Sequence, residues 1–544
     1  MNGPGFALFY AGDAYSTAQK IMGRQSAGEA MLKGLAHTWP DGPVVAFGQG
    51  GRPVGLERQL GGHGFRGAVE WQPGLAGPAA SGRAAAYYPA PPISDLAHAR
   101  NAVSPSAYSL FGVTHTLSSG GAMDQIGRMV LAPFQPWDAL ICTSQAALDV
   151  VQRLFAAHRD WARAHLGASR FVRPQTPVIP LGVDTERFAP APAARLAARK
   201  ALKLAEEETV FLFAGRLSFH AKANPAPFYA AAQTAAAEGR RIVAIDAGVF
   251  PNDFARRAYE RARSVLAPQV RFITVDGADR RAYDGAWRAA DVFVSLSDNV
   301  QETFGLTPLE AMAAGLPVLV SDWNGYRDTV RDGVDGICVP SFAPPPGGGD
   351  RVAAAHSSEE ISYDAFIGLL SLVTVVAPDR LVEAVRMLAD SPELRRRMGA
   401  AGRARACDSF GWSTILRRYD SLVGELSAQR PANPLAPTPW PGRPEPFGLF
   451  SGHATAAARG DWMASRVEGR GPGALEDLIG LTLANYGFMD AHLTEDDVRA
   501  AFDALGRGPM RLDALAAIHP DRRKGVFALM WLAKFDLIRL TPPA

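Results

Sequence analysis

Short apolar runs alternate with longer amphipathic stretches over the first 430 residues. In the first half, apolar runs over 6–12, 43–47 and 139–144 predict strands, and the patterns over 28–35 and 147–166 predict helices. In the second half, five apolar runs with helical segments between them predict strands over 209–215, 241–248, 270–277, 291–297 and 317–322. Because strands that alternate with helices favour a parallel sheet covered on both faces, the pattern predicts two doubly wound α/β units.

Other segments interrupt or follow this alternation. Residues 50–110 are rich in Gly, Pro and Ala, and their elements are not placed by periodicity. Residues 341–360 are interpreted as an insertion with a loop at its core, and 410–429 as a helix that closes the second unit. A proline-rich run over 431–447 predicts an extended, semi-rigid linker.

A length of 544 residues suggests three or four domains. The predicted boundaries are 1–180 for the first unit, 181–430 for the second, 431–473 for the linker and 474–544 for a small, mainly helical domain. Within the tail, 510–540 is interpreted as helix, turn, helix and strand, similar to a winged helix. Arg522, Arg523 and Lys524 are candidates for phosphate contacts there. Because the rest of the tail carries few basic residues, a protein partner or a homo-oligomer contact is favoured over nucleic acid.

Composition and charge narrow the class of protein. The net charge of +2 indicates no polyanionic partner, and no run of 18 apolar residues predicts a membrane span. The early apolar run has no basic region before it and is interpreted as a strand rather than a signal peptide. The three cysteines lie far apart, without disulfide or metal spacing, so a cytoplasmic protein is expected. A basic, aromatic segment over 153–173 leaves peripheral membrane binding as an alternative to a solvated helix.

One stretch, residues 299–322, concentrates polar chemistry between two apolar runs. Thr307, Pro308 and Glu310 fit a capping box at a helix start, so Glu310 has both a structural and a functional interpretation. Glu302 lies outside that capping pattern, and the alternative to a functional role is a solvated surface glutamate. The loop follows a predicted parallel strand, where doubly wound sheets bind ligands, and the helix start suits phosphate. Gly305 lets the backbone approach a ligand closely.

Several motifs resemble those of the retaining glycosyltransferases of family 4 (glycosyl transferases group 1). One is the Glu-x7-Glu pattern from Glu302 to Glu310, and the segment PLGVDTERF over 180–188 resembles the family's interdomain segment. The segment FAGRLSFHAK over 213–222 resembles its Gly-Arg…Lys loop, and the runs over 330–339 and 391–406 match the usual order. The resemblance covers most of residues 138–428.

The resemblance implies a GT-B architecture, in which two Rossmann-like domains face a cleft, and transfer of a sugar from a nucleotide-sugar with retained configuration. It also implies a sugar-donor site in the second unit. The residues it assigns there are Arg216 and Lys222 for the diphosphate, Glu310 for the ribose, Glu302 for the donor sugar, and the backbone of Gly305, Leu306 and Thr307 for phosphate.

Elementary chemistry supports these assignments. A departing nucleoside diphosphate gains negative charge, which fixed cations and a helix dipole stabilise. Lysine is scarce, with seven among 56 basic residues, so Lys222 beside the Gly-Arg strand end is notable; the alternative is a solvated basic loop. His220 and Ala221 stand where the family more often has an acidic residue, which leaves the loop shape open.

The first half carries weaker signals. Gly23 and Arg24 lie in the loop after the first predicted strand, where the family often has a glycine pair; an ordinary turn is the alternative. In the segment SLFGVTHTLSS over 109–119, His115 comes just after a strand-like run, and the resemblance implies a catalytic place near the donor sugar. A satisfied core histidine is the other interpretation.

Neither a metal nor a further cofactor is expected, because no Asp-x-Asp pair occurs and Arg216, Lys222 and a helix start offer positive charge instead. Three alternatives to a transferase stay open on the same architecture: a nucleotide-sugar epimerase, a phosphorylase, and a non-catalytic binding protein that responds to nucleotide-sugars.

Overall fold

The computed structural model describes residues 3–15, 23–51, 54–486 and 493–543, without the side chains of residues 13, 23, 24 and 26. By its contacts the chain divides into a unit over residues 1–440 and a unit over residues 441–544. No helix among the described residues is long and apolar enough to cross a membrane.

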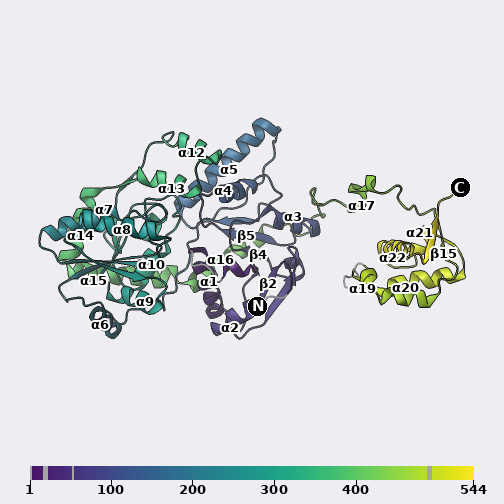
Figure 1. Ribbon diagram of the computed structural model, residues 1–544, viewed down its shortest axis with the longest axis horizontal. Coiled ribbons are helices and arrows are strands. Elements are labelled where there is room, and N and C mark those ends of the chain that lie inside the picture. Colours follow the sequence, from purple (N-terminus) through teal and green to yellow (C-terminus); the bar gives the residue numbers. More distant parts are fainter. Residues whose placement is uncertain (1–2, 16–22, 52–53, 487–492, 544) are drawn as a thin grey trace. The chain divides into compact units, whose positions relative to one another are not determined.

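The first sheet has six parallel strands in the order β3-β2-β1-β4-β5-β6 (Figure 1). The strands are β1 (Phe6–Phe9), β2 (Val44–Gly48), β3 (Val69–Pro73), β4 (Ala85–Tyr88), β5 (Ser109–Val113) and β6 (Ala139–Ile141). Side chains alternate between two cores, with Leu8 in one and Ala7 in the other. Helices α1 (Gly23–Thr38), α2 (Val54–Gly62) and α16 (Trp412–Ala428) contribute to the first core, and α3 (Ser94–Val103), α4 (Gly120–Arg128) and α5 (Gln145–Leu166) contribute to the second.

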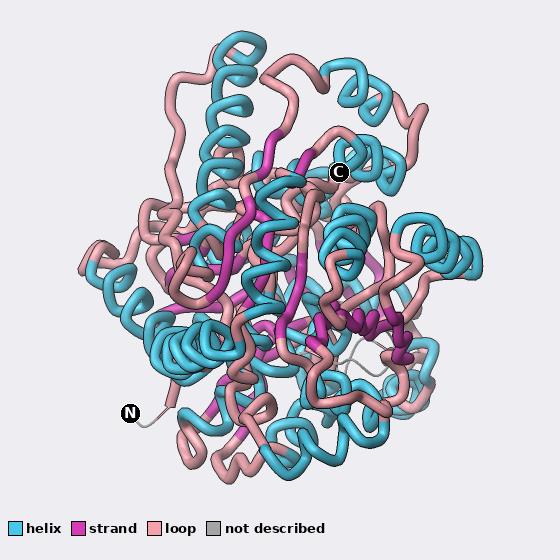
Figure 2. The backbone as a smooth tube through the Cα atoms, turned by 90° about the vertical axis from the view of Figure 1, so that its left-hand side faces the viewer, coloured by secondary structure: helices cyan, strands magenta, loops and turns pink. Residues whose placement is uncertain are grey.

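The second sheet repeats this topology, with six parallel strands in the order β12-β11-β10-β7-β8-β9. The strands are β7 (Thr209–Ala214), β8 (Ile242–Gly248), β9 (Arg271–Asp276), β10 (Val292–Ser295), β11 (Val318–Ser321) and β12 (Gly336–Val339). Figure 2 shows helices (cyan) around these strands (magenta). The helices are α7 (Ala226–Ala237), α8 (Asp253–Leu266) and α14 (Pro378–Asp390) on one face, and α9 (Arg280–Ala289) and α10 (Leu306–Ala313) on the other, with α6 (Pro192–Ala201) against α9 and α15 (Pro392–Phe410) against α10.

Both sheets have the strand order of a doubly wound Rossmann sheet. The order reverses between β1 and β4 in the first sheet and between β7 and β10 in the second. Ligands of such sheets bind beyond the carboxyl ends of the strands at this reversal. The prediction of two Rossmann-like doubly wound sheets is therefore confirmed.

The closing helix α16 returns from the second sheet to the first. The backbone N–H of Gly5 donates to Oδ1 of Asp420 at 2.7 Å, and the ring of Tyr419 packs edge-on against Phe111. A Cβ atom on Gly34 of α1 would lie 2.4 Å from the Cβ atom of Trp412, so α1 and α16 approach too closely for any larger residue. The two sheets thus share a packed core through α16.

The predicted linker is not free along its whole length. After α16, the N–H of Thr438 donates to the carbonyl of Asn101 at 2.7 Å, and the Ser104 hydroxyl donates to the carbonyl of Leu435 at 2.8 Å. The ring of Trp440 stacks on His98 with centroids 4.8 Å apart. Residues 435–440 therefore lie against α3 and the loop that follows it.

The C-terminal unit begins before the predicted boundary at residue 474. Strand β15 (Met463–Arg466) lies within the predicted linker, yet it pairs antiparallel with β16 (Met510–Arg511) and β17 (Ile538–Thr541). The strand was not predicted from the sequence because it has only four residues and lies near prolines and glycines. The remaining elements are α17 (Pro446–Leu449), α18 (Pro472–Ile479), α19 (Thr482–Asn485), α20 (Glu495–Ala504), α21 (Leu512–Ala516) and α22 (Arg522–Lys534).

The tail has the predicted order of helix, turn, helix and strand in α21, α22 and β17. Arg522 and Arg523 are exposed at the start of α22, and the same helix exposes Val526, Phe527 and Met530. A mixed apolar and basic face suits a protein partner, which remains a prediction for this unit.

Candidate functional site

The loops that follow β7 and β10 lie side by side at the reversal point of the second sheet. The first holds Arg216 and Lys222, and the second holds Glu302 and Gly305. Two partly buried hydrogen bonds join them: the Asn299 amide donates to the carbonyl of His220, and the Ser297 hydroxyl donates to the carbonyl of Lys222 at 3.3 Å. These bonds fix the two loops as one surface.

Two further contacts join the candidate cations to the second loop. Nη2 of Arg216 donates to Oε1 of Gln301 at 3.3 Å, and Nζ of Lys222 lies 3.3 Å from Oε2 of Glu302. The structure thus brings together three residues that the sequence assigned separately to the diphosphate and to the donor sugar. In this state Lys222 and Glu302 neutralise one another.

The electrostatics of Glu302 reflect this pairing. Its side chain is only 15% exposed, and burial opposes the charged form. Lys222 and the backbone N–H groups of Thr303 and Phe304 outweigh that effect and hold the pKa of Glu302 below its usual range. Glu302 is therefore a fixed carboxylate, and a solvated surface position is excluded.

The helix start differs from the predicted capping box. The N-cap of α10 is Gly305 rather than Thr307, and no side chain caps the helix. Gly305 has φ = 89°, a left-handed conformation that favours glycine, and a Cβ atom there would lie 2.0 Å from the Tyr326 ring. The capping prediction was wrong because tertiary packing of Tyr326 moves the helix start two residues earlier. The N–H groups of Leu306 and Thr307 remain at the first helical turn, without a side-chain cap.

Glu310 therefore has no capping function and lies partly buried on α10. Within the described residues its carboxylate makes no hydrogen bond or ion pair. Burial raises the pKa of Glu310 to about 7, against the opposing charges of Arg187 and Lys222. An unsatisfied carboxylate of this kind is suited to accept hydrogen bonds from a ligand, such as the ribose hydroxyls that the sequence assigned to it.

Glu310→Gln is expected to stabilise the ligand-free protein relative to wild type as the pH rises. The folded-state pKa of about 7 lies above that of an unfolded glutamate, so the folded state binds the extra proton and wild-type stability falls between pH ~4.5 and ~7. The difference between variant and wild type should grow by up to about 3 kcal/mol across this window and stay level above it.

Thermal unfolding at pH 5 and pH 8 measures this effect. The matched control is Glu425→Gln, at an exposed position of α16. A Glu310→Gln difference that does not change with pH would show that the Glu310 carboxylate is already well solvated or paired.

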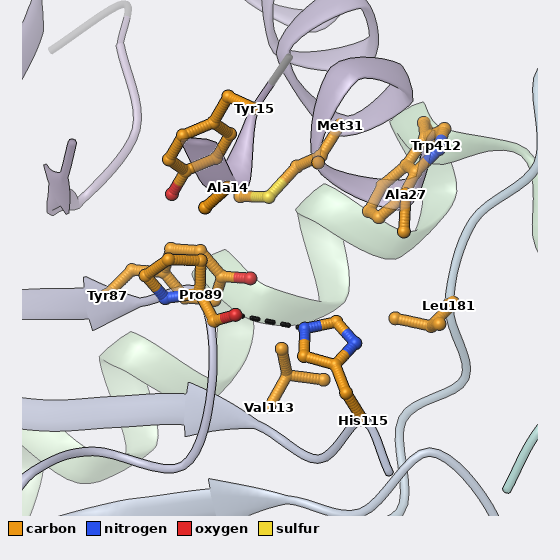
Figure 3. Close-up of a pocket in the computed structure, with 11 residues that line it drawn as sticks. Ala14, Tyr15, Ala27, Met31, Tyr87, Pro89, Val113, His115, Leu181 and Trp412 are labelled. Atoms are coloured by element: carbon orange, nitrogen blue, oxygen red, sulfur yellow. Dashed lines mark hydrogen bonds between the residues drawn. The ribbon is translucent and has the colours of Figure 1, made fainter. Parts of the chain in front are cut away.

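In the first sheet, a small pocket lies beyond the strands at the reversal point (Figure 3). It is lined by Tyr15 after β1, Pro89 after β4, His115 after β5, and Met31 of α1, with Trp412 of α16 closing it. Most of the lining is apolar, and the His115 ring points into this group in Figure 3.

His115 is held by a hydrogen bond from its Nε2 atom to the carbonyl of Pro89, 2.9 Å away. Because a carbonyl only accepts, Nε2 carries the proton in this contact. The predicted catalytic place of His115 therefore remains a prediction, with the ring fixed at the mouth of the first sheet. Gly23 and Arg24 are the first two residues of α1; the side chain of Arg24 lies outside the described part of the structure.

The two sheets meet through the helix start of α5. The Ser144 hydroxyl donates to the carbonyl of Thr303 at 2.9 Å, and Nζ of Lys33 pairs with Oδ2 of Asp184 at 2.6 Å. Ser144 also caps α5. The Ser144 contact positions the Glu302 loop relative to the first sheet, and neither contact was predicted from the sequence. The local signal is a polar residue in the loop after a buried strand, as at Asn299 after β10 and Ser144 after β6.

No group of three or more His, Cys, Asp or Glu side chains is arranged to hold a metal ion among the residues with described side chains. The three cysteines, Cys142, Cys338 and Cys407, form no disulfide.

Comparison with known proteins places a family domain over the second sheet. Residues 195–344 match the family described as "Glycosyl transferases group 1". The chain is 37% identical to a D-inositol 3-phosphate glycosyltransferase of Geodermatophilus obscurus over 197 residues, 34% of this chain and 42% of that protein. It is 34% identical to the enzyme of the same name from Thermobispora bispora over 288 residues, 52% of this chain and 58% of that protein.

The chain spans about half the length of the curated relatives it matches. Among solved structures, a glycosyltransferase from Rickettsia africae superposes with a TM-score of 0.51 and 11% identity, covering 78% of this chain and 99% of that one. Residues 195–344 are therefore similar to the glycosyl transferases group 1 family, and the chain has the GT-B fold of two Rossmann-like sheets.

Proposed function

We propose that the protein is a retaining glycosyltransferase that transfers a sugar from a nucleotide-sugar to a hydroxyl of a polyol phosphate. The observation that carries this proposal is the joined pair of loops after β7 and β10, which presents Arg216, Lys222 and Glu302 at the reversal point of the second sheet. A site that binds a nucleoside diphosphate at this point needs fixed cations and free helix N–H groups, and both are present there.

The roles follow from the charges. The leaving diphosphate gains negative charge as the sugar departs, and Arg216, Lys222 and the start of α10 are placed to stabilise it. Binding of the diphosphate to Lys222 frees the Glu302 carboxylate to accept hydrogen bonds from the donor sugar. Glu310 is suited to the ribose, and the His115 side of the first sheet to the acceptor.

The acceptor class is drawn from the relatives that match over about half their length, which are named D-inositol 3-phosphate glycosyltransferases. D-inositol 3-phosphate is therefore the first acceptor to test. We place the reaction in the cytoplasm, which agrees with the absence of disulfides among the three cysteines.

The experiment incubates the protein with UDP-, GDP- and ADP-sugars, with and without D-inositol 3-phosphate, and follows release of the nucleoside diphosphate. Acceptor-dependent release supports transfer, and NMR of the product anomer tests retention. Epimerised sugar would instead support the epimerase alternative, and binding of a nucleotide-sugar without turnover would support a non-catalytic protein.

Turnover is expected to persist in excess EDTA. Arg216, Lys222 and the uncapped start of α10 provide the positive charge that a divalent ion provides in other enzymes of this chemistry. The measurement is the rate of nucleoside diphosphate release after dialysis against EDTA, with added Mg²⁺ or Mn²⁺ as the control. A rate that is lost with EDTA and restored by either ion contradicts the expectation.

A further inference from the structure

The insertion after β12 is a folded element rather than the loop that the sequence pattern indicated. It consists of the antiparallel pair β13 (Ser341–Phe342) and β14 (Val375–Val376) and two helices, α12 (Asp350–Ser357) and α13 (Tyr363–Leu372). The imidazole of His356 stacks on the ring of Phe366 with centroids 4.5 Å apart, which joins the two helices. In Figure 1 the pair lies beside α4 and α5 of the first sheet.

Helix α13 contacts both loops of the candidate sugar-donor site. Oδ2 of Asp364 lies 3.9 Å from Nε2 of His220, in the loop that carries Lys222. Near its other end, the buried hydroxyl of Ser371 lies near the buried carboxyl of Asp298, in the loop after β10, and lowers its pKa against the larger effect of burial. These contacts hold α13 over the carboxyl ends of the second sheet.

The first residue of α13 reaches the first sheet. The Tyr363 hydroxyl lies 2.7 Å from Oγ of Ser118 and 3.5 Å from Oγ1 of Thr116, and those two oxygens are 3.4 Å apart. Ser118 and Thr116 belong to the loop after β5, directly beyond His115. We call Thr116, Ser118 and Tyr363 the hydroxyl cluster; all three side chains are partly exposed.

The hydroxyl cluster has hydrogen-bonding capacity that its internal contacts do not use. Three hydroxyls provide about three donors and six acceptor lone pairs, so their three mutual contacts leave about three acceptor positions for another molecule. No charged atom takes part in the three contacts, so the cluster favours a neutral polar ligand over an ion. A polyol or sugar, whose neighbouring hydroxyls both donate and accept, fits this arrangement.

From this geometry we infer that the hydroxyl cluster is the subsite for the hydroxyl groups of a polyhydroxylated acceptor, and that Tyr363 is an acceptor-binding residue contributed by the insertion. The inference rests on the proposed transferase function and assigns part of its acceptor specificity to α13. Its place next to His115, at the carboxyl ends of the first sheet, is where an acceptor meets a sugar held by the second sheet.

The test compares Tyr363→Phe with wild type in steady-state kinetics, with D-inositol 3-phosphate, myo-inositol and glucose as acceptors. Tyr363→Phe removes only the hydroxyl and is expected to raise the acceptor KM about threefold to tenfold, the range for one lost hydrogen bond. The donor KM should change by less than about twofold. Ser357→Ala is the matched control, because it removes a hydroxyl of the same insertion that bonds only within α12.

Ser118→Ala is a second test variant, and it leaves the insertion itself unchanged. The double variant Tyr363→Phe/Ser118→Ala should raise the acceptor KM by less than the product of the single effects, because both hydroxyls belong to one subsite. An unchanged acceptor KM in Tyr363→Phe, or an equal rise in the donor KM, would overturn the inference. If none of the three acceptors accelerates release of the sugar from the nucleotide by the wild-type protein, the inference is also overturned. Hydrolysis of the nucleotide-sugar without any acceptor, measured in the same assays, tests the transferase function separately.

Discussion

Lys222→Ala is expected to weaken binding of a nucleoside diphosphate by about tenfold to a hundredfold. A hydrogen bond to a charged group contributes roughly 1.5–3 kcal/mol, and each 1.4 kcal/mol is tenfold in affinity. The carbonyl of Lys222 accepts a hydrogen bond from Ser297, and its Nζ atom pairs with Glu302 at 3.3 Å, so both ends of the residue are held at the loop after β10. Calorimetric titration with UDP, GDP and ADP measures the loss.

Lys200→Ala is the matched control, because Lys200 is an exposed lysine of α6 in the same unit. Wild-type affinity in Lys222→Ala would assign Lys222 to the solvated surface instead of the diphosphate.

The same variant is also expected to change how the stability of the protein depends on pH. Because Lys222 holds the pKa of Glu302 below its usual range, the stability from this pair is fully present above the unfolded carboxyl pKa and is lost as pH falls through the lower folded-state pKa. The stability difference between wild type and Lys222→Ala should therefore shrink in acid.

The sequence predicted the second sheet well because its strands are buried on both faces. The apolar runs at 209–215, 241–248 and 291–297 coincide with β7, β8 and β10. A parallel sheet between two helical layers requires such apolar runs, and the loops that follow the strands form the candidate site. The positions of Lys222 and Glu302 after β7 and β10 were therefore readable from the pattern and the motifs together.

Elements that depend on tertiary contacts were not readable. The side chains of strand β3 are partly buried or exposed, and β4 is a four-residue run among Gly, Pro and Ala. The region 50–110 therefore shows no regular alternation of hydrophobic and polar residues. Gly305 as the helix cap follows from the Tyr326 ring, 20 residues further along the chain, and the local capping pattern at Thr307 pointed elsewhere.

The pairing of candidate residues was likewise invisible in the sequence. Lys222 and Glu302 lie 80 positions apart, and only the topology of the sheet brings them together. The insertion is a similar case, because Tyr363 meets Ser118 across 245 positions. The motifs therefore indicated candidate residues, whereas the fold decides which of these candidates share charge and hydrogen bonds.

Glu302→Gln is expected to act in the opposite direction from Lys222→Ala on diphosphate binding. The substitution keeps the shape of the side chain but removes the charge that neutralises Lys222 at 3.3 Å. Lys222 is then available without displacing a carboxylate, so nucleoside diphosphate affinity should hold or rise. If Glu302 contacts the donor sugar as it reacts, kcat should nevertheless fall about tenfold to a hundredfold, the loss of one charge-assisted hydrogen bond in the transition state.

These opposite signs separate a catalytic role of Glu302 from a structural one. If Glu302 only positions Lys222, then Glu302→Gln should weaken diphosphate binding as Lys222→Ala does. The changes in kcat and KM should then match those of Lys222→Ala. The double variant Lys222→Ala/Glu302→Gln completes the cycle and measures the coupling of the pair. Calorimetry with the nucleoside diphosphate and steady-state kinetics on the same four proteins give both quantities. Near-normal kcat in Glu302→Gln would remove Glu302 from the reacting centre, and its carboxylate would then serve only to hold Lys222 in place.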